Sequence, residues 1–288
     1  MATIDRSTFM GGSAALIAAA NAVPADAQSA DFGHPHPPIV PENDPAITTQ
    51  HGTLTRPDAT ISAYIAMPKT VKATTPGIVL CAHIWGVDSQ YRDLARRFAK
   101  LGYIAIAPGI FDRSNPPSGD GVTDLSLMAP GVAALYAGNK MNGDLLAGKA
   151  WIRTQAPRGK VGIYGNCMGG GIVLQALVGN KDYDAASVLY GYVRADRKAT
   201  EPPPDGAFDW ATKVTTPVIG FYAGLDAGIA TPDVQAAYAK LAGPHDVTTY
   251  PDGKHGFLDD TRGSYNAADA TDAYAKMIAW YGKYLTTT

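Results

Sequence analysis

Residues 160–170 read KVGIYGNCMGG, a short apolar stretch that runs into a cysteine with glycines on both sides. The apolar part, residues 160–164, predicts a strand, and the apolar run at residues 170–177 predicts a helix. A tight turn between a strand and a helix leaves little room for side chains, which accounts for Gly165 and Gly169. The pattern indicates a nucleophile at Cys167, with a buried cysteine in a Gly-rich turn as the plainer alternative.

Strand and helix patterns alternate from about Thr53 to the C-terminus. Strands are expected at residues 61–67, 76–82, 103–107, 186–190, 216–222 and 246–250, and helices at residues 89–101, 144–154, 232–241 and 267–284. Residues 108–143 contain Pro116, Pro117 and several glycines, and read as a looser segment that covers the site. The alternation predicts an α/β fold in a single domain, with a mostly parallel central sheet and helices on both faces.

The N-terminal segment differs in composition from the rest of the chain. Arg6 precedes a small and apolar stretch at residues 9–23, and residues 25–27 match an A-x-A cleavage pattern. Residues 1–27 therefore predict a signal peptide and export to the periplasm; the alternative is a cytoplasmic protein with an amphipathic leader. The apolar stretch is too short and too rich in Gly and Ala for a membrane span, so we expect none in the mature protein.

Residues 28–52 are rich in Pro, Asp, Asn and His, and predict an extended lead-in to a folded domain at residues 53–288. Two histidines in this segment, His34 and His36, lie between prolines. Such residues usually belong to a solvated strap, so we expect no metal site here.

Composition and charge exclude several classes of function. Hydrophobic residues make up 46% of the chain and charged residues 17%, as in packed globular enzymes. The formal net charge of -2 offers no basic field for nucleic acid. Two cysteines exclude a disulfide scaffold, but a Cys81–Cys167 bridge in an exported protein is an alternative that would silence the nucleophile. Both a monomer and a small homo-oligomer fit these features.

A thiol nucleophile needs a base, and the base needs an acid that orients it. Asp226 follows the strand expected at residues 216–222, and His255 follows the strand expected at residues 246–250. The carboxyl ends of parallel strands meet at one edge of a sheet, where ligands bind. The sequence therefore predicts that Cys167, Asp226 and His255 form a catalytic triad. His245 and Asp252 are the nearest competitors for the base and the acid.

The same turn predicts how negative charge would be stabilised. Cys167 begins a helix, whose free N–H groups and dipole favour the thiolate. An oxyanion hole is expected from the backbone N–H of Met168, the residue after the nucleophile. The second N–H is expected from the loop after the strand at residues 76–82, where Ile84 is the candidate.

From about Thr53 onward the chain resembles the dienelactone hydrolase family. The matching pieces are HIWGV at residues 83–87, RDLARR at residues 92–97, APGIF at residues 107–111, GNCMGG at residues 165–170 and HGF at residues 255–257. The resemblance implies an α/β-hydrolase fold, a Cys-Asp-His triad on Cys167, Asp226 and His255, no cofactor, and hydrolysis of lactones or esters.

The resemblance also bears on substrate contacts. It implies that Arg113 binds a substrate carboxylate, and Trp85 is a candidate pocket residue. His83 stands where the family usually has glutamate, so activation of the thiol is expected to differ, and we expect His83 to brace the oxyanion hole. A second substrate arginine would follow the catalytic histidine, but here Asp259 and Asp260 come first and Arg262 only later.

The sequence thus predicts a hydrolase that cleaves a small-molecule ester or lactone through a thioester intermediate, with no metal and no cofactor. Arg113 leaves room for a substrate that bears a carboxylate. Two alternatives stay open. One is a general exported carboxylesterase without preference for lactones, and the other is a non-catalytic binding protein of the same fold.

Overall fold

The computed structural model describes residues 38–114, 120, 122, 124–138, 140–196 and 198–286. The predicted signal peptide at residues 1–27, the two histidines at positions 34 and 36, and the prolines at positions 116 and 117 lie outside the described residues. Among the described helices, none is both long and apolar enough to cross a membrane.

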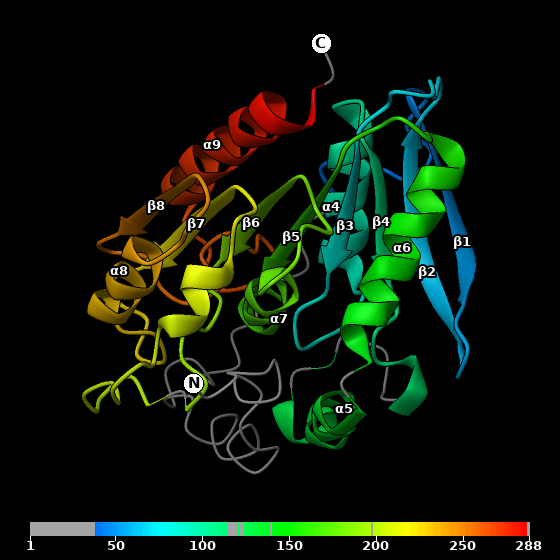
Figure 1. Ribbon diagram of the computed structural model, residues 1–288. Coiled ribbons are helices and arrows are strands. Elements are labelled where there is room, and N and C mark those ends of the chain that lie inside the picture. The colour runs from blue at the N-terminus through cyan, green and yellow to red at the C-terminus, as the bar shows by residue number, and fades with distance from the viewer. Residues whose placement is uncertain are drawn as a thin grey trace.

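An eight-stranded sheet forms the centre of the molecule, in the order β1-β2-β4-β3-β5-β6-β7-β8 (Figure 1). Its strands are β1 (Ile47–Thr55), β2 (Thr60–Pro68), β3 (Gly77–Cys81), β4 (Ile104–Pro108), β5 (Val161–Asn166), β6 (Ala185–Leu189), β7 (Val218–Ala223) and β8 (His245–Tyr250). Strand β2 is antiparallel to both β1 and β4, and every other pairing is parallel. The carboxyl ends of β3 to β8 therefore lie at one edge.

Helices cover both faces of this sheet (Figure 1). Helices α4 (Ser89–Lys100) and α9 (Ala267–Leu285) share one face, and α6 (Met141–Gln155), α7 (Cys167–Leu177) and α8 (Thr231–Ala239) cover the other. The ring of Phe98 on α4 lies 6.0 Å from that of Tyr281 on α9 and 6.2 Å from that of Tyr164 on β5. With both faces covered, β3, β4, β5, β6 and β7 are buried along their whole length. The predicted α/β fold is confirmed.

Two elements were not predicted from the sequence. Strand β1 begins within residues 28–52, which were expected to form the extended lead-in, and runs past them to Thr55. As an edge strand it is mostly polar and exposed, so it lacks the apolar pattern of a buried strand. The folded domain therefore begins before residue 53. Helix α5 (Leu125–Gly138) lies within the segment read as loose, and it contains Pro130, which normally argues against a helix. The short helices η1 (Asp112–Ser114) and η2 (Asp209–Lys213) complete the fold.

The chain before β1 is fastened to α4 by buried polar contacts. The carboxylate of Asp93 accepts the backbone N–H groups of Ile39 at 3.1 Å and Val40 at 2.9 Å. The same carboxylate accepts the guanidinium of Arg97 at 2.5 Å, and Arg96 donates to the Val40 carbonyl. The extended segment is thus held by a carboxylate on the outer face of α4.

Replacing this buried carboxylate should weaken the fold. In Asp93→Ala, two backbone N–H groups lose their acceptor and Arg97 keeps only Asp260, and breaking a buried ion pair by removing one partner costs about 3–5 kcal/mol. Urea unfolding should show a loss of that order. Lys240→Ala, which removes an exposed pair with Asp209, should cost less than about 1 kcal/mol. Equal losses in the two variants would contradict the structural role of Asp93.

Candidate active site

Cys167 lies at the sharp turn between β5 and α7. Its backbone has a φ of 52°, in the left-handed region that residues other than glycine rarely adopt. A Cβ atom at Gly169 would lie 2.2 Å from the carbonyl oxygen of Cys81, and one at Gly165 would lie 2.4 Å from the carbonyl oxygen of Gly169. Only glycine fits at these two positions, because the first turn of α7 lies directly against the end of β3 at Gly169 and against the end of β5 at Gly165.

The three residues predicted to form the triad come together at the carboxyl edge of the sheet. Asp226 follows β7 and His255 follows β8, and His255 Nδ1 lies 2.6 Å from Asp226 Oδ2. Asp226 also accepts the backbone N–H of Gly228 at 2.9 Å, and its side chain is 4% exposed. His255 and Cys167 also influence each other's pKa, through charge attraction and hydrogen bonding. His255 is thus bonded to Asp226 and electrostatically coupled to the Cys167 thiol.

The charges around Cys167 and His255 favour a thiolate beside an imidazolium. Burial raises the pKa of the Cys167 thiol, but attraction to His255 and their hydrogen bond outweigh it and bring the pKa down to about 7. The imidazole of His83 and the backbone N–H of Met168 make smaller contributions to this lowering. Burial lowers the pKa of His255, but Asp226 and Cys167 raise it well above its ordinary value.

The two candidate donors of the oxyanion hole come from neighbouring segments, the start of α7 and the loop after β3. Met168 is the second residue of α7, and its backbone N–H hydrogen-bonds to Cys167. Ile84 lies in the loop between β3 and α4 and is half-buried against the core. Because β3 and β5 are neighbouring strands, this loop begins beside the turn that carries Cys167.

His83 is buried in the same loop and bonded to a carboxylate. Its Nε2 lies 2.9 Å from Asp88 Oδ2, and the other oxygen of Asp88 accepts the N–H of Tyr91 and caps α4. The His83 ring also packs against the Tyr91 ring, with centroids 4.8 Å apart. His83 is therefore fixed in place by the first turn of α4.

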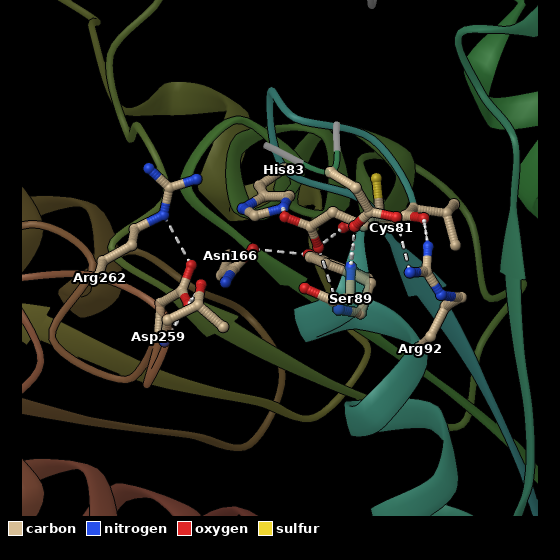
Figure 2. A network of polar contacts seen from close by, with 12 residues as sticks. Cys81, His83, Ser89, Arg92, Asn166, Asp259 and Arg262 are labelled. Carbon is tan, nitrogen blue, oxygen red and sulfur yellow. Dashed lines mark hydrogen bonds and ion pairs between the residues drawn. The ribbon is translucent and has the colours of Figure 1, made fainter. Parts of the chain in front are cut away.

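The loop after His255 carries a second set of ion pairs (Figure 2). Arg262 Nε donates to Asp259 at 2.7 Å, and its guanidinium lies 5.0 Å from the centre of the Trp85 ring. Asp260 pairs with Arg97 on α4 at 2.6 Å. These contacts tie the histidine loop to α4 and to the loop that carries Ile84.

Arg113 has partners other than those expected from the sequence. Its guanidinium forms bidentate contacts with Asp144 on α6, which is fully buried, and with Asp58 in the β1–β2 turn. Both partners lie toward the β1 edge, on the other side of β4 from the strand that carries Cys167. Substrate binding by Arg113 therefore stays a prediction.

One further polar residue at the site was not singled out from the sequence. Asn166, the residue before Cys167, is buried and lies between two tyrosine hydroxyls. Its amide oxygen is 2.6 Å from the Tyr91 hydroxyl, and its amide nitrogen donates to the Tyr190 hydroxyl at 3.2 Å. Only the position of Asn166 inside the G-x-C-x-G pattern could have suggested a role.

The alternatives to the predicted site residues were His245 as base and Asp252 as acid. His245 is exposed and bonds the carbonyl of Gly243, and Asp252 is also exposed. Both cysteines are free, and Cys81 is completely buried. Within the described part of the chain, no group of three or more His, Cys, Asp or Glu residues is arranged to hold a metal ion.

The chain is similar to known proteins over most of its length. The model of the dienelactone hydrolase family matches residues 61–285. A relative from Escherichia coli O157:H7 named "Putative carboxymethylenebutenolidase" is 30% identical over 250 residues, which cover 85% of this chain and 91% of the relative. A relative of the same name from Methylorubrum extorquens is 32% identical over 232 residues, which cover 79% of this chain and 78% of the relative.

The fold is also similar to that of a solved relative. The crystal structure of a "Putative Dienelactone Hydrolase" from Klebsiella pneumoniae superimposes with a TM-score of 0.68 at 27% identity, covering 83% of this chain and 100% of that one. The family match spans nearly the whole sheet, including the turn at Cys167 and the loops of Asp226 and His255. The chain belongs to the dienelactone hydrolase family, a family of ester and lactone hydrolases.

Proposed function

We propose that this protein hydrolyses a small-molecule ester or lactone, with Cys167 as nucleophile, His255 as base and Asp226 as its orienting acid. The observation that carries the proposal is the hydrogen bond between His255 and Asp226 at the carboxyl edge of the sheet, together with the electrostatic coupling of His255 to the Cys167 thiol. Nucleophile, base and orienting group in mutual contact are the signature of covalent acyl transfer.

The first half of the reaction forms a thioester. The Cys167 thiolate attacks the substrate carbonyl, and the N–H groups of Met168 and Ile84 stabilise the oxyanion. As the tetrahedral intermediate collapses, the imidazolium of His255 donates its proton to the leaving alkoxide. Cys167 is then acylated, and a lactone ring is opened.

The second half releases the product. Neutral His255 takes a proton from a water molecule, which attacks the thioester carbonyl, and the oxyanion forms again at the same two N–H groups. The intermediate expels the thiolate and leaves a carboxylic acid, so one water is consumed for each bond cleaved. Asp226 fixes the tautomer of His255 throughout and stabilises the imidazolium when it forms.

A second candidate is a general carboxylesterase with no preference for lactones. It is favoured by the bidentate contacts of Arg113 with Asp144 and Asp58, because acidic lactones would need this guanidinium for themselves. The coupling of the Cys167 thiol to His255 argues against a purely binding role. Export to the periplasm stays a proposal that rests on residues 1–27.

Removing the nucleophile tests the mechanism directly. Cys167→Ala should lower the kcat for p-nitrophenyl acetate by a factor on the order of 10³ or more, since removal of one triad member disables the whole unit. Circular dichroism and urea unfolding should show that the variant is folded. Cys81→Ala is the matched control and should retain turnover; full turnover in Cys167→Ala would remove the mechanism.

The acidity of Cys167 should appear in its reactivity. Because only the thiolate is alkylated, the rate with iodoacetamide should rise with pH and reach half its plateau at about pH 7. Below that pH the sulfur gains a proton and the rate falls. Mass spectrometry should find the label on Cys167 alone, because burial raises the pKa of Cys81 and excludes the reagent. A midpoint at the ordinary thiol value, or above it, would contradict the thiolate–imidazolium pair.

Arg113→Ala separates a substrate contact from a structural one. With its guanidinium already bound to two carboxylates, we expect this change to lower the urea midpoint. It should leave the ratio of kcat/KM for p-nitrophenyl hemisuccinate and p-nitrophenyl acetate within about twofold, because neither transition state loses a contact. A selective loss for the acidic ester would instead assign Arg113 to the substrate carboxylate.

A further inference from the structure

Two residues share an unusual backbone conformation. Among the described residues other than glycine, positive φ values occur only at Cys167, with 52°, and at Tyr190, with 37°. Cys167 follows β5 and Tyr190 follows β6, and these strands are neighbours, with Asn166 paired to Leu189. Strained residues persist where the surrounding structure fixes them, and they cluster at functional sites. The strain at Cys167 is explained by the nucleophile turn, whereas the strain at Tyr190 needs its own explanation.

The backbone after β6 has little freedom, because it lies against the first turn of α7. A Cβ atom at Gly191 would lie 2.5 Å from the carbonyl carbon of Gly170, and one at Gly170 would lie 2.8 Å from the Cα of Gly191. The chain must therefore turn sharply at Tyr190 to pass the helix. The turn leaves the Tyr190 side chain almost fully buried.

Both ends of the Tyr190 side chain contact the site. Its ring lies 5.0 Å from the imidazole of His255 and 5.4 Å from the ring of Phe257, two residues further along. Its hydroxyl accepts the amide N–H of Asn166 at 3.2 Å. Asn166 is the residue before Cys167, so Tyr190 connects the nucleophile turn to the base (Figure 2 shows Asn166 in its polar network).

We propose that Tyr190 is a positioning residue, which holds the imidazole of His255 in line with Cys167 through its ring and is itself held by Asn166. This inference rests on the proposed function. Asp226 anchors one nitrogen of His255 but leaves the ring free to swing about that bond. Contact with the Tyr190 ring limits that rotation. The hydrogen bond from Asn166 fixes the position of the Tyr190 ring relative to the turn that carries Cys167.

The test compares two changes at Tyr190 with a control residue whose side chain contacts the same two strands, β5 and β6. Tyr190→Phe removes the hydroxyl and keeps the ring, and Tyr190→Leu removes both. Tyr281→Phe is the control, because the buried Tyr281 hydroxyl also joins β5 and β6, through the Ile163 carbonyl at 2.8 Å and Ser187 at 2.6 Å. Its position on α9 keeps it away from His255. The measurements are kcat and KM for p-nitrophenyl acetate, the midpoint pH of Cys167 alkylation, and urea unfolding.

A positioning role predicts a graded loss in kcat with KM nearly unchanged. We expect a decrease on the order of fivefold for Tyr190→Phe, as for one lost hydrogen bond, and on the order of 100-fold for Tyr190→Leu, as for a misplaced catalytic group. The alkylation midpoint should rise in both, because His255 contacts the thiolate less of the time. Tyr281→Phe should lose stability while kcat and the alkylation midpoint stay the same.

Other outcomes overturn the proposal. If kcat and the alkylation midpoint of Tyr190→Leu match the wild type, or if only KM rises, Tyr190 is a pocket wall and no more. If Tyr190→Leu does not fold, the isosteric Tyr190→Phe decides alone by the same two readouts. Alkylation needs no turnover, so a wild-type protein without Cys167-dependent esterase activity would end the proposed function while the alkylation midpoints still show whether Tyr190 positions His255.

Discussion

The first turn of α7 lies so close to the end of β3 that no side chain fits between them. Gly169 meets the carbonyl oxygens of Cys81 and Ala82 there, and this contact fixes where the helix begins. Cys167 is forced into a left-handed conformation, and its side chain projects from the turn at the helix N-terminus. The same contact brings the loop with Ile84 alongside the turn that carries Cys167.

Electrostatics at the site follow from that packing. A thiol placed among buried groups would ordinarily hold its proton, because burial penalises the charged form. The protein offsets this penalty with a histidine that is itself kept cationic by a buried carboxylate, Asp226. His83 and its partner Asp88 add a second imidazole–carboxylate pair beside β5, on the side of β3 rather than of β8. The charges are set before substrate arrives, which is the preorganisation that electrostatic catalysis requires.

The parts of the fold and site that depend on local pattern could be predicted from the sequence. Buried parallel strands are continuous apolar runs in the sequence, so the strands β3 to β7 could be predicted. Parallel strands end at one edge of the sheet, so residues that follow them, such as Cys167, Asp226 and His255, could be predicted to lie close together. Strand β1 and helix α5 were missed because one is a polar edge strand and the other holds a proline.

Residues whose role depends on a distant partner could not be predicted in the same way. Position along the chain placed Arg113 beyond a strand end, but only the folded structure shows that Asp144 and Asp58 engage it. The role of Asn166 was equally hard to predict, because no local sequence pattern marks an amide next to Cys167. Its function is set by Tyr91 and Tyr190, which come from a helix and a strand end far away in sequence.

Paired arginines also bear on which esters such a site would favour. Arg113 is bound to Asp144 and Asp58, and Arg262 is bound to Asp259. A substrate carboxylate that bound Arg113 would compete with two aspartates that already engage Nε, Nη1 and Nη2, exchanging one ion pair for another and leaving a displaced carboxylate in need of solvation. An uncharged ester makes no such exchange. Recognition through Arg113 would therefore give an acidic substrate little net advantage over an uncharged one.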